Sequence, residues 1–226
     1  MAMSVPFLFF DVGGTLLRTA RPVGELYGEI ARHYGVKADA GLLDAAFRKV
    51  LREQRTREPG LRSADDRAWW RHVVALTWEG VGRPEGFPTA DYFEELYAAY
   101  ARPDQWRLFP DVLPALERAA DKGWPLGVFS NWDVRLRGLL HGLGLAEYFE
   151  AIAISSEIGA EKPQRLAFER AGQLAGRSER ELILIGDDPE IDLRGAREAG
   201  WLDCRLRGEG GDLGRILEEI ESQYCR

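Results

Sequence analysis

Short apolar segments alternate with amphipathic stretches through most of this chain, and that alternation restricts its fold more than any other feature. Each segment ends in turn or polar residues; the five are Val5 to Val12, Pro125 to Asn131, Ala151 to Ser156, Leu182 to Asp187 and Trp201 to Leu206. Helical periodicity marks the stretches between the later segments, at 134–143, 165–174 and 191–199. Buried strands that alternate with helices build a parallel, doubly wound sheet. The sequence therefore predicts an α/β fold with a Rossmann-like core.

Residues 18–102 interrupt this alternation. Helical periodicity runs through 23–34, 42–57, 66–78 and 92–100, and no part of the insert has a convincing strand pattern. We therefore expect an inserted all-helical domain over 18–102 and an α/β core formed by 1–17 and 103–226. The spacing of three tryptophans in the insert predicts a packed helical face; they are Trp69, Trp70 and Trp78.

Charge and hydropathy exclude several classes of partner. The 226 residues include 30 Lys and Arg and 37 Asp and Glu, for a formal net charge of -7, and no basic block is present that would follow a phosphate backbone. Apolar runs are shorter than the roughly 18 residues that a membrane span needs, and the N-terminus lacks a signal-peptide pattern. We expect a cytoplasmic monomer or homodimer that binds neither nucleic acid nor membrane, and that holds a small anionic substrate in a local site.

The chemically active residues gather at the expected carboxyl ends of the strands and in one loop. They are the acids Asp11, Asp187, Asp188 and Asp192, the amine of Lys162, and the polar pair Ser130 and Asn131. In an open parallel sheet, ligands bind beyond these strand ends, where the strand order reverses. Carboxylates placed together would repel one another and raise each other's pKa unless a cation neutralised them. A hard divalent ion with oxygen ligands, Mg²⁺, is the economical explanation.

Several of these residues also have a purely structural interpretation. Asp11 could close a turn, and Asp188 could cap a helix that begins at Pro189. Asp133, which follows the second segment, is better explained as a helix cap than as a proton donor. What the structural interpretations leave unexplained is the joint placement of the set at one edge of the sheet.

Four motifs along the chain, DVGGTL, FSN, EKP and GDDPEID, resemble in order those of the haloacid dehalogenase (HAD) superfamily of aspartate-nucleophile hydrolases. The helical insert lies between the first and second motifs, where this family has a small helical cap domain. The stretches RAWWRHVV and GLGLAEYFE are most similar to the branch called haloacid dehalogenase-like hydrolase domain-containing protein 3. The resemblance implies a HAD-like core with an inserted cap, but it supplies no substrate.

The resemblance also implies roles for the motif residues. Asp11 would attack the substrate and form a covalent intermediate, and Lys162 would neutralise the nucleophile and the developing charge. The groups that hold the transferred phosphoryl would come from Val12, Gly13, Ser130 and Asn131. Mg²⁺ would bind Asp11, Asp187 and the main-chain carbonyl of Gly13. Either Asp188 or Asp192 would orient waters or Lys162 without binding the metal directly, and the sequence does not say which of the two does so.

The first motif departs from the phosphatases of the family at one position. They carry a second Asp two residues after the nucleophile, which protonates the leaving oxygen, whereas this chain has Gly13. The metal site survives the change because the family uses only the carbonyl of that residue. General acid–base assistance typically supplies about 10²- to 10⁴-fold. Phosphates with basic leaving groups should therefore suffer most.

The residues and the resemblance together imply a Mg²⁺-dependent phosphatase that acts on a small phosphorylated metabolite. Three alternatives stay open: a 2-haloacid dehalogenase, a phosphonatase that uses a cap lysine, and a binding or regulatory protein that has lost turnover. The acids of GDD disfavour the dehalogenase, whose relatives need no metal. The insert offers a phosphonatase only Lys37 and Lys49, in no recognisable motif. Arg62 is a candidate for contacting an anionic leaving group.

Overall fold

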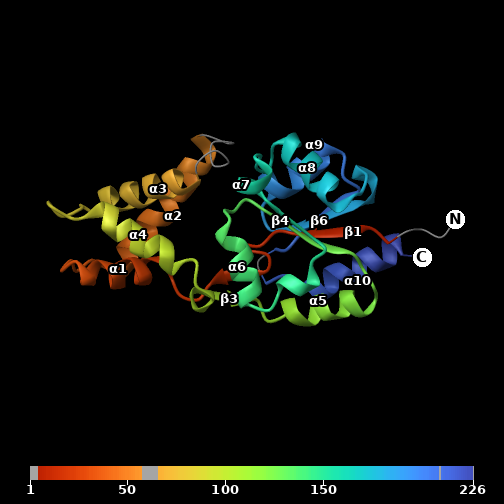
Figure 1. Ribbon diagram of the computed structural model, residues 1–226, viewed down its shortest axis with the longest axis horizontal. Helices are drawn as coiled ribbons and strands as arrows, with labels where there is room; N and C mark the ends of the chain where they lie inside the picture. The colour runs from red at the N-terminus through yellow and green to blue at the C-terminus, as the bar shows by residue number, and fades with distance from the viewer. Residues whose placement is uncertain (1–4, 58–65, 209, 226) are drawn as a thin grey trace. The chain divides into compact units, whose positions relative to one another are not determined.

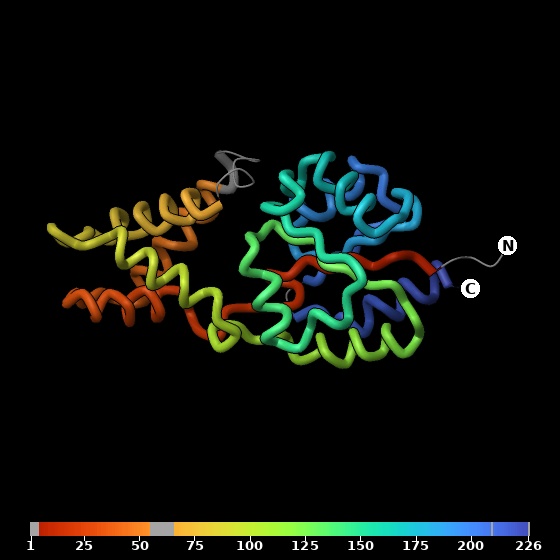
Figure 2. The backbone as a smooth tube through the Cα atoms, in the orientation of Figure 1, coloured from red at the N-terminus to blue at the C-terminus, as the bar shows by residue number. Residues whose placement is uncertain are grey.

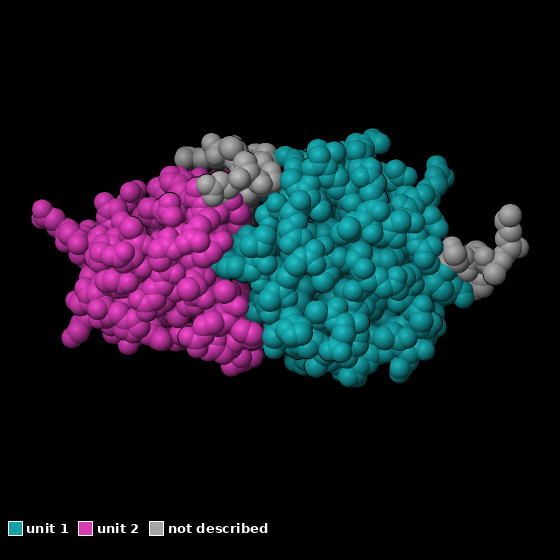
Figure 3. Space-filling model, in the orientation of Figure 1, with its two compact units in different colours: residues 1–18, 108–226 teal, residues 19–107 magenta. Residues whose placement is uncertain are grey.

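The computed structural model describes residues 5–57, 66–208 and 210–225, and the chain forms two compact units (Figure 3). One unit comprises Met1–Arg18 and Leu108–Arg226, and the other comprises Thr19–Arg107. This division, after Arg18 and before Leu108, differs from the predicted one, which fell after residue 17 and before residue 103. The candidate Arg62 lies outside the described residues.

The first unit is built on a five-stranded parallel sheet with the order β5-β4-β1-β6-β7 (Figure 1). Its strands are β1 (Phe7–Phe10), β4 (Leu126–Ser130), β5 (Ala151–Ile154), β6 (Leu182–Gly186) and β7 (Asp203–Leu206). Phe10 of β1 is paired with Val128 of β4 and with Ile185 of β6, so these three strands end side by side. The predicted α/β fold is confirmed. From β1 the chain continues to β4 and β5 on one side of the sheet and then crosses to β6 and β7 on the other side. The strand order therefore reverses at β1.

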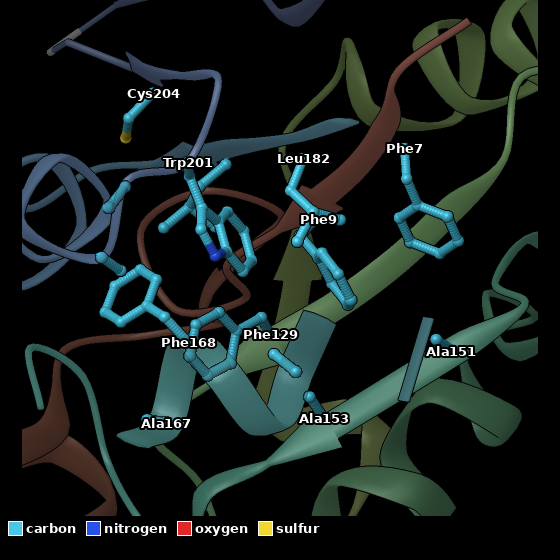
Figure 4. Packing of buried hydrophobic residues seen from close by; sticks show 14 of the residues in the cluster. Phe7, Phe9, Phe129, Ala151, Ala153, Ala167, Phe168, Leu182, Trp201 and Cys204 are labelled. Atoms are coloured by element: carbon cyan, nitrogen blue, oxygen red, sulfur yellow. The ribbon is translucent and has the colours of Figure 1, made fainter. Parts of the chain in front are cut away.

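Helices cover both faces of this sheet, with α8 and α9 on one face and α5 and α10 on the other (Figure 1). Their bounds are α5 (Val112–Asp121), α8 (Arg165–Ala175), α9 (Gly195–Ala199) and α10 (Leu213–Tyr224). Under α8 and α9, aromatic rings pack edge to face, as Figure 4 shows for Phe129 between Phe9 and Phe168. Gly127 makes this packing possible, because a Cβ atom there would lie 2.7 Å from the rings of Phe7 and Phe9.

Several short elements were missed by the periodicity analysis, together with the helices α5 and α10. Strands β2 (Leu17–Thr19) and β3 (Trp106–Leu108) form a two-stranded sheet, so the expectation of no strand at the start of the insert was wrong there. Three residues are too few to show alternation. Figure 2 traces the backbone out through β2 and back through β3. Helix α6 (Arg135–Gly142) is the one expected at 134–143. The other short helices are η1 (Pro103–Gln105), η2 (Ala146–Tyr148), α7 (Ser155–Ile158) and η3 (Glu179–Glu181).

The helix predicted at 191–199 is divided in the structure. A π-helical turn, η4 (Pro189–Arg194), comes first and α9 follows it. The carbonyl of Asp188 accepts hydrogen bonds from the N–H groups of both Asp192, at 2.9 Å, and Leu193, at 3.3 Å. The second bond spans five residues and widens the turn. Periodicity alone cannot reveal this, because one wide turn hardly changes the apolar pattern.

The second unit has a helical core of its own, as the sequence predicts. Its helices are α1 (Val23–His33), α2 (Ala40–Arg57), α3 (Asp66–Gly80) and α4 (Thr89–Ala99). Trp78 is 1% exposed and packs edge-on against Tyr92, with ring centroids 5.5 Å apart. Trp69 is also buried but packs in a separate cluster with Val50 and Val73, so the two residues are buried as expected without forming one face, while Trp70 is half-buried. No helix within the described ranges is both long and apolar enough to cross a membrane.

Candidate active site

A buried ammonium group lies at the carboxyl end of β1. The Nζ atom of Lys162 donates hydrogen bonds to Asp11 Oδ1 at 2.8 Å and to Asp192 Oδ1 at 2.6 Å. Lys162 is 2% exposed and Asp192 is 1% exposed. Burial by itself would lower the pKa of Lys162, but the two carboxylates raise it above its ordinary value. The lysine therefore stays charged, and removing either carboxylate would leave part of that charge without compensation.

The nucleophile candidate Asp11 is held in a site that is short of positive charge. Burial raises the pKa of Asp11 and the charge of Asp192 adds to the effect, while Lys162 and a hydrogen bond from Ser130 oppose it. The net direction is upward. Two buried carboxylates thus share a single ammonium group, so a further cation near Asp11 would favour its ionised form.

A third carboxylate, that of Asp187, joins this group from the end of β6. One oxygen from each of Asp11, Asp187 and Asp192 lies within 4.8 Å of the others. Burial, followed by the charges of Asp11 and Asp192, raises the pKa of Asp187 to about 7. The backbone makes room for this carboxylate at Gly14, where φ is +87° and an added Cβ would lie 2.1 Å from Asp187 Oδ2. Only glycine satisfies both conditions.

The structure distinguishes the two acids between which the sequence could not choose. Asp192 Oδ1 accepts from Lys162, and its Oδ2 accepts from the N–H groups of Asp187 and Asp188, each at 3.1 Å. Gly186 permits this approach, since a Cβ there would lie 2.3 Å from Asp192 Oδ2. Asp188 instead accepts from the backbone of Glu190 and Ile191 and caps η4. Asp192 therefore orients the lysine, and Asp188 has the structural role.

Asn131, expected to help hold the transferred group, binds the backbone of Lys162 in the structure. Its Nδ2 donates to the carbonyl of Lys162, and its Oδ1 accepts from the N–H of Lys162, both at 2.8 Å. The side-chain amide thus fixes the backbone of the lysine loop against the end of β4. The two contacts join residues far apart in the chain, so no local pattern predicts them.

The loop after β1 leaves backbone donors unused beside Asp11. The carbonyl of Val12 accepts from Leu16 at 2.9 Å and Leu17 at 2.8 Å, which folds the loop tightly. Within the described part of the chain, the N–H groups of Val12 and Gly13 donate no hydrogen bond. Val12 is fully buried, and buried N–H groups without a partner are rare in folded proteins. An anion bound next to Asp11 would supply the missing acceptors.

Gly13 has space where Gly14 has none. A Cβ added at Gly13 would lie 3.6 Å from Cζ3 of Trp132, which is the only contact within 4 Å among the described residues. Asp133, the other conceivable proton donor, accepts from the backbone of Arg135 at 2.9 Å and forms an ion pair with its side chain. Asp133 is therefore held at the start of α6 by Arg135, although Val134 and not Asp133 is the N-cap residue of that helix.

Sequence reasoning missed a buried arginine that supports the loop after β1. Arg207 follows β7, and its N–H donates to the carbonyl of Gly186 at 2.7 Å. Its guanidinium donates to the carbonyl of Thr15 at 3.1 Å and to Asp111 Oδ1 at 2.6 Å. The only available signal was the position of Arg207 at the end of a strand, at the same edge of the sheet as the other site residues.

Comparisons with known proteins agree with this geometry. The family model for haloacid dehalogenase-like hydrolase matches residues 7–200. A human protein named haloacid dehalogenase-like hydrolase domain-containing protein 3 is 33% identical over 201 residues, which is 88% of this chain and 80% of the human protein. This agrees with the branch that the sequence motifs suggested.

Two solved structures share the fold over nearly their whole length. A HAD phosphatase from Thermococcus onnurineus has a TM-score of 0.64 at 21% identity, covering 97% of this chain and 99% of that one. A 2-haloacid dehalogenase from Pseudomonas syringae pv. Tomato DC3000 has a TM-score of 0.66 at 23% identity, covering 98% of this chain and 100% of that one. The fold thus accommodates both reactions and does not choose between them. Taken with the family match and the human relative, it shows that the chain belongs to the haloacid dehalogenase-like hydrolase family.

Proposed function

We propose that the protein is a Mg²⁺-dependent phosphatase that transfers a phosphoryl group from a small metabolite to Asp11 and then to water. The observation that carries the proposal is the pair of unused N–H groups at Val12 and Gly13, one of them buried, beside Asp11 and the Lys162 ammonium. Backbone donors and a fixed positive charge next to a carboxylate suit the oxygens of a phosphoryl group.

The chemistry follows from these positions in two displacements. A carboxylate oxygen of Asp11 attacks phosphorus, and the bond to the leaving oxygen breaks, with its electron pair departing on that oxygen. The departing oxygen then takes a proton from solvent. Water next attacks the aspartyl phosphate, the bond between phosphorus and Asp11 breaks, and one proton of the water stays on the released phosphate while the other goes to solvent. Lys162 and the N–H groups of Val12 and Gly13 stabilise the charge on the phosphoryl oxygens.

The residues present fit a divalent cation. Three carboxylates face one ammonium group, and the raised pKa of Asp187 reflects that imbalance. Asp192 has both oxygens engaged, so Asp11 and Asp187 would hold the ion together with the carbonyl of Gly13, which accepts no hydrogen bond from any described residue. When bound, Mg²⁺ supplies positive charge that offsets the carboxylates and the phosphoryl oxygens.

The lack of a carboxylate at Gly13 defines which substrates suit this site. Without a donor there, the leaving oxygen departs as an anion, so the barrier rises with the basicity of the leaving group. Phosphates of acidic hydroxyl groups should therefore react faster than phosphates of simple alcohols. The need for a cation at the carboxylates supports phosphoryl transfer over dehalogenation, since displacing a halide requires no metal charge.

The proposal is tested by assaying the purified chain with p-nitrophenyl phosphate, glycerol 3-phosphate and 2-chloropropionate, each with Mg²⁺ and with EDTA. We expect Mg²⁺-dependent phosphate release, faster from the aryl ester, and no chloride release. Asp11→Asn should abolish turnover, whereas Asp121→Asn, at an exposed aspartate of α5, is the matched control and should not.

Two results would contradict the proposal in different ways. Failure to hydrolyse either phosphate, with Asp11→Asn indistinguishable from the wild type, would favour a binding or regulatory protein. Chloride release that persists in EDTA would favour the dehalogenase instead.

A further inference from the structure

The indole of Trp132 borders the side of the site that lacks a carboxylate. Its Cζ3 atom is 3.6 Å from where a Cβ at Gly13 would be. A phosphoryl group held by the N–H groups of Val12 and Gly13 would lie against this part of the loop. Atoms attached to that group on the side of Gly13 therefore come within reach of the indole, which is half-buried.

The backbone that carries Trp132 is anchored at the residue itself and on both sides. The carbonyl of Trp132 accepts from Ser155 Oγ at 3.0 Å and from the N–H of Ser156 at 3.2 Å. The residue before it, Asn131, is fixed by its two bonds to Lys162. The residue after it, Asp133, accepts from the backbone and side chain of Arg135. The indole thus stands on a rigid support instead of a free loop.

We propose that Trp132 is a specificity-determining residue that contacts the leaving group and favours aryl phosphates. This inference rests on the proposed phosphatase function and narrows its substrate class. Two independent features select the same class. The site lacks a proton donor at Gly13, which requires a leaving oxygen that is stable as an anion, and an aryl oxide meets that requirement. The adjacent indole offers a planar apolar surface, and aromatic rings pair favourably in stacked or edge-on arrangements.

A comparison of two activated phosphates separates these features. p-Nitrophenyl phosphate has an acidic leaving group with a ring, and acetyl phosphate has an acidic leaving group without one. In Trp132→Leu we expect the ratio of kcat/KM for the aryl substrate to that for acetyl phosphate to fall about three- to tenfold, mostly through KM. Trp132→Phe, which keeps a ring, should retain most of the ratio.

The matched control is Trp124→Leu, which makes the same substitution just before β4, at the opposite end of that strand from Ser130. It should leave the ratio unchanged. A wild-type ratio in Trp132→Leu would overturn the inference while leaving the phosphatase intact. Hydrolysis of neither substrate by the wild type would instead overturn the proposed function.

Inhibition of the wild type gives a second measurement that does not depend on the folding of a variant. Phenylphosphonate and methylphosphonate carry the same charged group and differ in the ring. We expect phenylphosphonate to bind about three- to tenfold more tightly. Equal inhibition constants would overturn the inference even if Trp132→Leu failed to fold.

Discussion

Gly13 and Gly14 are neighbours in the chain, yet they border two unlike sides of the site. At Gly14 an added Cβ would lie 2.1 Å from the Asp187 carboxylate, and at Gly13 the first neighbour would be the Trp132 ring at 3.6 Å. The Gly14 side contains the carboxylate cluster and the buried lysine. Among the described residues, no titratable side chain lies within 4 Å of a Cβ at Gly13. The contrast is between a side rich in charged groups and a side with a ring as its neighbour, and the proposed function depends on that difference.

Removing the lysine should have the largest effect, because it disrupts the charged side directly. In Lys162→Met, Asp11 and Asp192 lose their shared partner, and breaking a buried ion pair costs about 3–5 kcal/mol of unfolding free energy. Turnover should fall at least about 10³-fold, since a preorganised charge is lost. Urea unfolding and steady-state kinetics measure the two effects. The double variant Lys162→Met/Asp192→Asn should recover part of the stability but none of the activity. If Lys162→Met were as stable as the wild type, the two carboxylates would not need the charge of the lysine.

Adding one methyl group at each glycine compares the two sides under the same substitution. Gly14→Ala forces an unfavourable positive φ and displaces Asp187, so we expect a loss of roughly 2–3 kcal/mol. Gly13→Ala should change stability by less than about 0.5 kcal/mol. Thermal or urea unfolding gives the stabilities, and calorimetric titration with Mg²⁺ should show weaker binding only in Gly14→Ala. Equal effects at the two positions would contradict the contrast.

Gly13→Asp supplies the open side with the carboxylate that it lacks. We expect kcat/KM for glycerol 3-phosphate to rise about 10- to 100-fold, less than a fully evolved general acid provides. The rate with p-nitrophenyl phosphate should change little, because its leaving group needs no proton. Gly13→Asn has the same shape without an ionisable proton, so an equal gain in both variants would mean that proton donation is not the cause.

The smallest effect is expected at Asp111, which supports both sides through the loop that they share. Burial by itself raises the pKa of Asp111, but Arg207 and the N–H of Leu213 lower it by more, so the net shift is downward. A carboxylate whose pKa is lower in the folded than in the unfolded state stabilises the fold at any pH above the unfolded pKa. That stabilisation is lost as the pH falls through the folded pKa. Asp111→Asn should therefore be about 1 kcal/mol less stable at pH 7, with the difference shrinking as the pH falls below the ordinary pKa of an aspartate, about 4. Urea midpoints across this range measure it, and a constant difference would exclude an ionic contribution.

The sequence predicted the components of the site better than their contacts. Asp11 and Asp187 were expected together because parallel strands end at one edge of a sheet, and that rule needs only the strand pattern. Lys162 was expected beside them from the loop before α8. Of the two partners of Lys162, Asp11 was expected, whereas the choice between Asp188 and Asp192 stayed open because it depends on the π-helical turn that carries Asp192. The bonds of the Asn131 amide to Lys162 were not predictable for a related reason, since they join it to a backbone segment distant in sequence. The three-residue strands β2 and β3 escaped because local pattern needs length.

The π-helical turn η4 makes the site sensitive to the number of residues in one short segment. Asp187 precedes the turn and Asp192 lies within it, so the turn sets how the carboxylate at the end of β6 is placed relative to the carboxylate that accepts from Lys162. Removing one residue would restore α-helical spacing and rotate Asp192 by about 100° around the helix axis. Lys162 would then lose one partner while Asp187 kept its place at the end of β6. Exposed side chains such as Glu190 and Arg194 can vary within this segment, but its length cannot.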